Sequence, residues 1–185
     1  IRIDADVVTG VPDSSISAAI GFSEATGIPY ELGLIKNRYV GRTFIQPSQD
    51  LRERGVKMKL SPVRQVVKGK RVVMVDDSIV RGTTSKRIVT LLRQAGATEV
   101  HVRIVSPTMT HPCCYGVDTT TLDDLLLARM SIEEAKEYIG ADSLAFLSYE
   151  QCLASSCGKC EKMCFACFNG EYPTPLFHEI KDTNK

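Results

Sequence analysis

Apolar positions along this chain follow two periods, and the change between them predicts where strands and helices lie. Short apolar runs bounded by Gly, Pro, Asp or Ser predict strands over 5–11, 30–35, 72–75, 99–106 and 143–147. Apolar residues spaced three and four positions apart predict helices over 15–26, 86–96 and 121–129. A further helix opens at Ser131, where Glu134 completes the spacing of a capping box. Strands that alternate with helices predict an α/β fold with a parallel sheet.

Two stretches depart from this alternation. Residues 36–62 show no clean period, and a stretch of that length without regular structure is usually functional or disordered. The last thirty or so residues are rich in cysteine and poor in apolar periodicity. We therefore expect one domain over 1–150 and a cysteine-rich C-terminal tail over 151–185 that packs on it.

The segment from Val72 to Ser85 combines a buried strand, two carboxylates and a polar turn that opens a helix. The turn offers backbone N–H groups and three hydroxyls at a helix N-terminus, which suits a phosphate monoester. Asp76 and Asp77 would repel that phosphate, and they suit vicinal hydroxyls or a hard cation such as Mg²⁺. A ligand with a sugar diol beside a phosphate satisfies both halves. The alternative is an ordinary strand–turn–helix whose acidic residues face solvent.

A second strand end, Val11-Pro12-Asp13-Ser14-Ser15, also leads directly into a predicted helix. It can present N–H groups and a hydroxyl to an anion. By itself the same sequence is only a helix N-cap. The presence of the downstream turn favours a binding role for both.

Positive charge is concentrated in the segment Lys36-Asn37-Arg38-Tyr39-Val40-Gly41-Arg42-Thr43-Phe44. A charge run of this kind is often a solvated loop. In a protein whose turns suit phosphate groups, however, a mobile basic lid can place cations over the ligand and exclude water. We therefore predict a lid.

Seven cysteines are the anomaly in the composition, and most of them lie near one end of the chain. Their odd number and clustering argue against a disulfide framework, and metal ligation in a reducing cytoplasm is the expected use. The pairs Cys157–Cys160 and Cys164–Cys167 are closer together than the two knuckles of a usual zinc ribbon, whereas an iron–sulfur cluster tolerates such crowding. A thioredoxin-type redox motif is disfavoured because that motif opens a helix after a strand.

The remaining composition limits the classes of partner. The net charge of +1, with 43% hydrophobic and 24% charged residues, is typical of a soluble globular protein without a nucleic-acid or membrane partner. No apolar run has the length of a membrane span, and no signal-peptide pattern opens the chain, so a cytoplasmic location is expected. Because the sequence starts at Ile1, we expect a mature product or an excised fragment. His101, His111 and His178 show no ligand spacing.

The segment from Val72 to Ser85 resembles the phosphoribosyl pyrophosphate (PRPP) motif of the type I phosphoribosyltransferases, which implies their parallel-sheet fold. The basic segment up to Lys59-Leu60-Ser61 is similar to the flexible loop of the glutamine PRPP amidotransferases. By this resemblance Ser14, Asp76 and Asp77 bind Mg²⁺, and the catalytic residues are Asp76, Asp77, Lys36, Arg42 and Lys59. The implied substrate-binding residues are Asp13, Ser14, Ser15, Tyr39, Ser78, Arg81, Gly82, Thr83, Thr84 and Ser85. Of these, 81–85 hold the 5′-phosphate and 13–15 the pyrophosphate.

The tail from Cys164 to Pro173 and the loop His111-Pro112-Cys113 are similar to the iron–sulfur type of glutamine PRPP amidotransferase. The resemblance implies a [4Fe–4S] cluster held by Cys113, Cys164 and Cys167, with a fourth ligand upstream of Ile1. Cys157 and Cys160 have no role in that set, and one of them could replace the upstream ligand.

Because the resemblance spans essentially the whole chain, it implies the phosphoribosyltransferase half of such an enzyme, without some upstream sheet elements. That family transfers ammonia, released from glutamine by a separate glutaminase domain, to PRPP. The products are 5-phosphoribosylamine and pyrophosphate, in the first step of purine synthesis. Purine nucleotides as feedback inhibitors and a homo-oligomer are implied as well. Two alternatives remain: another type I phosphoribosyltransferase, which would not need the cysteine tail, and a PRPP-binding regulator, which should carry a DNA-binding domain and a basic face.

Overall fold

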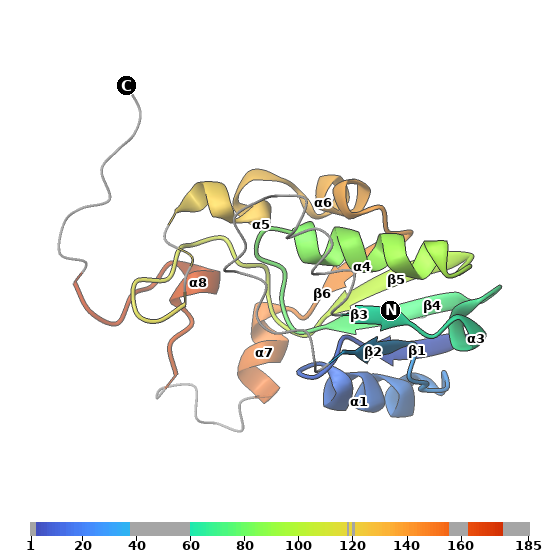
Figure 1. The fold of residues 1–185 in the computed structure, drawn as a ribbon. Coiled ribbons are helices and arrows are strands. Elements are labelled where there is room, and N and C mark those ends of the chain that lie inside the picture. The colour runs from blue at the N-terminus through green and yellow to red at the C-terminus, as the bar shows by residue number, and fades with distance from the viewer. Residues whose placement is uncertain (1–2, 38–59, 118, 120, 156–162, 176–185) are drawn as a thin grey trace.

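The computed structural model describes residues 3–37, 60–117, 119, 121–155 and 163–175. Within these ranges four parallel strands form a sheet in the order β1–β4–β5–β6 (Figure 1). Their bounds are β1 (Val7–Gly10), β4 (Arg71–Asp76), β5 (Glu99–Ile104) and β6 (Ser143–Phe146). A separate antiparallel pair is made by β2 (Leu34–Lys36) and β3 (Leu60–Pro62).

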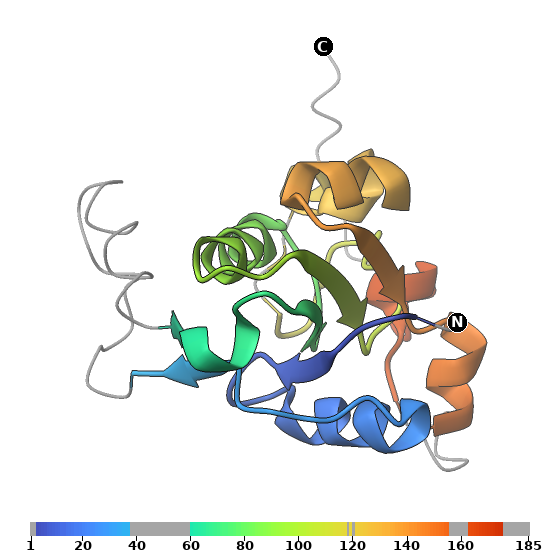
Figure 2. The same ribbon diagram turned by 90° about the vertical axis from the view of Figure 1, so that its right-hand side faces the viewer.

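Helices cover both faces of the parallel sheet, as expected for this class. On one face lie α4 (Thr83–Gln94) and α6 (Ile132–Ile139), and on the other α1 (Ile16–Thr26) packs against β1 and β4 (Figures 1 and 2). The shorter helical segments are α3 (Arg64–Val67), the 3₁₀ helix η2 (Leu122–Asp124), α5 (Leu126–Arg129), α7 (Tyr149–Ser155) and α8 (Ala166–Asn169). No helix in the described part of the chain combines the length and apolar content needed to cross a membrane.

Strand β4 is buried on both sides, which explains its unbroken apolar sequence. Val72 and Met74 belong to the larger core with Ile88 of α4. Val73 and Val75 point the other way and pack in a smaller core that includes Ala19 of α1. Each fully buried side chain of this size contributes about 1.5–3 kcal/mol. The strand therefore anchors the acidic residues that follow it.

Two predicted elements differ from the structure. In the segment 30–35, Tyr30 makes one parallel bridge to Val8, and the strand proper begins only at Leu34 and pairs with β3 instead of entering the parallel sheet. The helix predicted over 121–129 is broken into η2 and α5 at Leu125, whose backbone is extended. The break buries the Leu125 side chain completely, so tertiary packing overrides the helical period. The short helices α3, α7 and α8 were not predicted.

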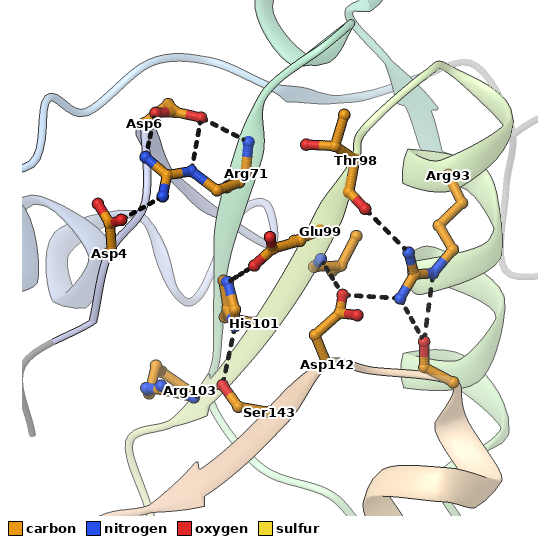
Figure 3. Close-up of polar contacts among 12 residues, drawn as sticks. Asp4, Asp6, Arg71, Arg93, Thr98, Glu99, His101, Arg103, Asp142 and Ser143 are labelled. Atoms are coloured by element: carbon orange, nitrogen blue, oxygen red, sulfur yellow. Dashed lines mark hydrogen bonds and ion pairs between the residues drawn. The ribbon is translucent and has the colours of Figure 1, made fainter.

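The amino-terminal half of the sheet carries a polar network (Figure 3). Arg71 donates from Nη2 to Asp6 Oδ1 at 2.8 Å and also contacts Asp4. These bonds lower the pKa of Asp6 to about 2. Beside them, His101 Nε2 lies 3.0 Å from Glu99 Oε2, and its Nδ1 lies 3.0 Å from Ser143 Oγ. The Arg71 ion pairs join β4 to the segment that leads into β1, and the His101–Ser143 contact joins β5 to β6, whereas Glu99 and His101 lie in the same strand.

Candidate functional site

The two predicted turns meet at the carboxyl edge of the sheet. Because β1 and β4 are parallel neighbours with Gly10 opposite Val75, the segments that follow them begin side by side. The Val11 N–H donates to the Val75 carbonyl at 2.9 Å, and Ser15 Oγ donates to Asp76 Oδ1 at 3.2 Å. A Cβ on Gly10 would lie 2.8 Å from the Ser15 carbonyl oxygen, so the close return of the first turn needs glycine there.

Both helices that start at this edge lack a side-chain cap. The hydroxyl of Ser15, the N-cap residue of α1, bonds to Asp76 and not to the helix. The N-cap residue of α4 is Gly82, which has no side chain to offer. Among the described residues no N-cap side chain binds the first backbone N–H groups of either helix, so these can bind another acceptor, and the helix dipoles favour an anion there. By contrast, α6 begins with the predicted capping box, confirmed by Ser131 and Glu134.

The acidic pair lies between these two helix ends. Asp76 is only 6% exposed, and burial is the main reason that its pKa rises to about 6, with the Asp77 charge adding to the rise. The backbone N–H of Asp77 and the Ser15 hydroxyl both stabilise its ionised form. Asp77 itself is exposed and accepts a hydrogen bond from Ser78 Oγ at 3.1 Å. One shielded and one exposed carboxylate are thus available as oxygen acceptors for hydroxyl groups or a hard cation.

The structure places some of the other predicted site residues near the first turn and does not describe the rest. Lys36, at the end of β2, is brought to the first turn, where Nζ lies 2.6 Å from Asp13 Oδ2. Ser14 is exposed, and the hydroxyl that contacts Asp76 belongs to Ser15. Tyr39, Arg42 and Lys59 lie outside the described residues, as does most of the predicted lid.

The phosphate-type turn is supported by a segment that the sequence did not single out. Arg81 Nε donates to Asp124 Oδ1 at 2.8 Å, and the Leu126 N–H donates to the Val80 carbonyl at 2.8 Å. Gly82 has a φ of +74°, and an added Cβ would lie 2.7 Å from Leu126 Cδ2. Because 43 positions separate Arg81 from Asp124, no local pattern could have linked them. In the sequence, the adjacent carboxylates Asp123 and Asp124 were the feature that could have suggested a partner for Arg81.

The cysteines of the predicted cluster lie on two segments that contact each other. The Cys167 carbonyl accepts the N–H groups of Thr110 and His111 at 3.1 Å each, and Tyr172 Oη donates to the Pro112 carbonyl at 2.6 Å. Backbone N–H groups that point at the sulfur lower the pKa of Cys113. Burial raises the pKa of Cys167, and the nearby thiols of Cys113 and Cys164 raise it further.

This donor set suits thiolate ligation from both segments. Within the described ranges, however, no three His, Cys, Asp or Glu side chains are grouped to hold a metal ion. Cys157 and Cys160 are not among the described residues.

Comparison with known proteins finds relatives of high sequence identity. No protein-family profile matches the chain. It is 66% identical to the amidophosphoribosyltransferase of Bacillus subtilis, over 96% of this chain and 38% of that protein. Over nearly its whole length the chain is thus similar to one part of an amidophosphoribosyltransferase. The amidophosphoribosyltransferases of Synechococcus elongatus and Methanocaldococcus jannaschii are 60% and 55% identical, each over 96% of this chain. The chain spans 36–38% of the length of these relatives.

Two solved structures show the same likeness. A glutamine PRPP amidotransferase from B. subtilis, complexed with ADP and GMP, superposes on this chain with a TM-score of 0.83 at 66% sequence identity. The match covers 96% of this chain and 40% of the B. subtilis chain. A structure described as the allosteric regulatory enzyme of purine biosynthesis gives the same TM-score at 65% identity, covering 97% of this chain and 39% of that one. These likenesses confirm the predicted type I phosphoribosyltransferase fold. The packing of the whole 151–185 tail stays a prediction.

Proposed function

We propose that this chain is the phosphoribosyltransferase part of an amidophosphoribosyltransferase. It binds PRPP with Mg²⁺ and transfers ammonia derived from glutamine to the anomeric carbon, giving 5-phosphoribosylamine and pyrophosphate in the first step of purine synthesis. The observation that carries this proposal is the pair of uncapped helix N-termini, joined by the Ser15–Asp76 bond, with two carboxylates between them. One N-terminus suits a pyrophosphate and the other a phosphate monoester.

The acidic pair orients the sugar. Asp76 and Asp77 would accept hydrogen bonds from the ribose diol and, together with Ser14, would hold Mg²⁺, which typically takes one or two carboxylates plus substrate phosphates. Mg²⁺ supplies positive charge that stabilises the leaving group. The turn 81–85, with Ser78 beside it, holds the 5′-phosphate through N–H groups and hydroxyls. Because ammonia is already a nucleophile, no general base is required, and positioning provides much of the rate enhancement.

The first turn and the basic segment receive the leaving group. Asp13 and Ser15 belong to the loop that would bind the pyrophosphate, and the Lys36 side chain, from β2, contacts Asp13 in this loop. By family resemblance Tyr39, Arg42 and Lys59 complete the lid. As the anomeric carbon develops oxocarbenium-like character, these cations would stabilise the departing pyrophosphate and keep water from competing with ammonia.

Calorimetric titration of the full-length encoded protein with PRPP and Mg²⁺ tests the proposal. The double variant Asp76→Asn/Asp77→Asn should fold normally and lose PRPP binding, because amides cannot replace a charged ligand pair. The matched control Glu24→Gln/Glu137→Gln changes two exposed carboxylates on α1 and α6 and should bind like the wild type. Unchanged PRPP affinity in the Asp76/Asp77 variant would exclude this site.

We also propose a [4Fe–4S] cluster held by Cys113, Cys164 and Cys167, with its fourth ligand outside the described residues. The contacts between their two segments support it, as does the effect of Cys113 and Cys164 on the pKa of Cys167. A cluster there would hold the tail to the domain and take no part in the transfer itself.

Partners and domain limits are proposed on the same basis. Purine nucleotides are proposed as feedback inhibitors, since the B. subtilis neighbour was solved with ADP and GMP. We propose a homo-oligomer in the cytoplasm, a phosphoribosyltransferase domain over 1–150 and a docked tail over 151–185. Because the relatives are more than twice as long as this chain, the glutaminase activity that supplies ammonia is assigned to polypeptide beyond it.

A further inference from the structure

We propose that Asp124 is a positioning residue for the 5′-phosphate half of the substrate site. It acts through Arg81 and does not itself touch the ligand. The inference rests on the proposed function, because it assigns a role within the same site. It concerns η2 and α5, which lie outside the two turns that the sequence indicated as binding sites.

The Asp124 carboxylate is fixed at both oxygens. Oδ1 accepts the hydrogen bond from Arg81 Nε at 2.8 Å, and Oδ2 accepts one from Thr121 Oγ1 at 3.1 Å. With each oxygen bonded to a different partner, the carboxylate has a defined orientation. It can therefore hold the Arg81 side chain in one place instead of merely offsetting its charge.

Three consecutive turn residues are contacted by this one segment. The Val80 carbonyl accepts the Leu126 N–H, Arg81 bonds to Asp124, and Gly82 lies directly beneath the Leu126 side chain. Leu125 lies between Asp124 and Leu126, the two residues that make these contacts. Its backbone is extended and its side chain is fully buried, which fixes the chain at this point. The backbone of 80–82 is thus held immediately before the N–H groups at the start of α4.

Electrostatics explain why the pair must be intact. A carboxylate beside a phosphate site is unfavourable by itself because like charges repel. The Arg81 hydrogen bond is the main reason that the pKa of Asp124 is lowered, so the two groups remain an ion pair at neutral pH. Arg81 carries five N–H donors, and Asp124 engages the one at Nε. The positive charge of Arg81 offsets the negative charge of Asp124, so the ion pair can hold the turn without repelling a phosphate.

The role predicts which ligands should be affected. Ribose 5-phosphate and PRPP share the 5′-phosphate, whereas inorganic pyrophosphate occupies only the first turn. Loss of a positioning contact at 80–82 should weaken the first two ligands together and leave the third unchanged. A purely structural defect would not discriminate between the halves of the site.

Calorimetric titration of the full-length encoded protein with each ligand and Mg²⁺ is the test. For Asp124→Asn we expect affinity for PRPP and ribose 5-phosphate to fall roughly 10- to 100-fold, as for a lost charged hydrogen bond, with pyrophosphate affinity unchanged. Asp123→Asn is the matched control, because Asp123 is the exposed neighbour on η2, and it should bind all three ligands normally. Asp124→Glu should restore part of the loss.

Thr121→Val removes only the second contact of the carboxylate and should give a smaller loss with the same two ligands, which provides a test even if Asp124→Asn unfolds. Unchanged ribose 5-phosphate affinity in both variants overturns the positioning role. An equal loss for pyrophosphate overturns it as well. Wild-type protein that binds none of the three ligands instead overturns the proposed function.

Discussion

Ser15 and Ser131 are both N-cap residues, yet their hydroxyls have different partners. Ser131 Oγ accepts the Glu134 N–H and caps α6, whereas Ser15 Oγ donates to Asp76 and leaves α1 uncapped. The sequence predicts the cap at Ser131 from Glu134, but it gives no sign of which partner the Ser15 hydroxyl takes. The difference appears only when β4 brings Asp76 beside Ser15. At the level of single residues, the candidate site depends on a serine that bonds to Asp76 and leaves the N-terminus of α1 uncapped.

Gly82→Ala should destabilise the protein by about 1–3 kcal/mol, since a φ of +74° is strained for alanine and the new Cβ would meet Leu126. Chemical denaturation measures the loss, and PRPP affinity should fall with it. Gly21→Ala is the control: Gly21 lies within α1 with open space around its Cα, so alanine there should be neutral or stabilising. Equal effects of the two substitutions would contradict the strain argument.

Among the elements, those that a local pattern specifies were predicted well. Strand β4 carries an unbroken apolar run and β5 alternates apolar with polar residues, and both patterns are local. Asp76 and Asp77 were found because they directly follow the apolar run of β4. Elements shaped by distant contacts were not predicted. The break at Leu125 depends on a bond to Val80, and the short strand β2 depends on β3, which lies beyond the basic segment.

The capping box of α6 gives a test at this scale. Ser131→Ala removes the acceptor of the Glu134 N–H, so the free energy of unfolding should fall by about 1 kcal/mol. Urea denaturation measures it. Ser17→Ala, at an exposed position within α1, should have no such cost and is the matched control. A Ser131 variant as stable as the control would mean that the box is not formed in solution.

For the molecule as a whole, the two ends of the sheet have different chemistry. The amino end is held together by ion pairs between strands (Figure 3), and the carboxyl end exposes uncapped N–H groups and acidic side chains. Stability and binding therefore respond to different conditions. Binding at the second should respond to Mg²⁺ and phosphates, and to mild acid because the pKa of Asp76 is about 6. The ion pairs of the first should weaken only as the pH falls from 3.8 towards 2.

The Asp6–Arg71 pair makes stability depend on pH. Because the pKa of Asp6 is lowered to about 2, its contribution is complete above the ordinary value of 3.8 and is lost as the pH falls from 3.8 towards 2. Asp6→Asn should therefore be less stable than the wild type at pH 6, and the difference should shrink below pH 4. Thermal unfolding across this range measures it. Asp123→Asn, whose side chain is exposed, should show a much smaller pH-dependent difference.

The tail should be held by its cluster. Anaerobically prepared full-length protein is expected to be brown and to contain iron and acid-labile sulfide, and Cys164→Ser should lose both. Exposure to oxygen should then loosen the tail and speed its proteolysis, because the described contacts of Cys167 and Tyr172 with 110–112 are hydrogen bonds, which the cluster would reinforce with metal–sulfur bonds. Cys152→Ser, in α7, is the control and should retain the iron. Colourless protein with stoichiometric zinc would require a zinc site instead.

The neighbouring strands β1 and β4 come from distant parts of the sequence, and this sets the order in which the molecule can assemble. Their contact between Asp6 and Arg71 closes a loop of 65 positions, whereas β4 and β5 are joined through the single helix α4. Loop-closure entropy grows with loop length, so the β4–α4–β5 unit should form early and β1 should dock late. A chain stalled before that step would already contain the phosphate turn. It would lack the partner turn, so the complete substrate site arises only with the last strand to join the sheet.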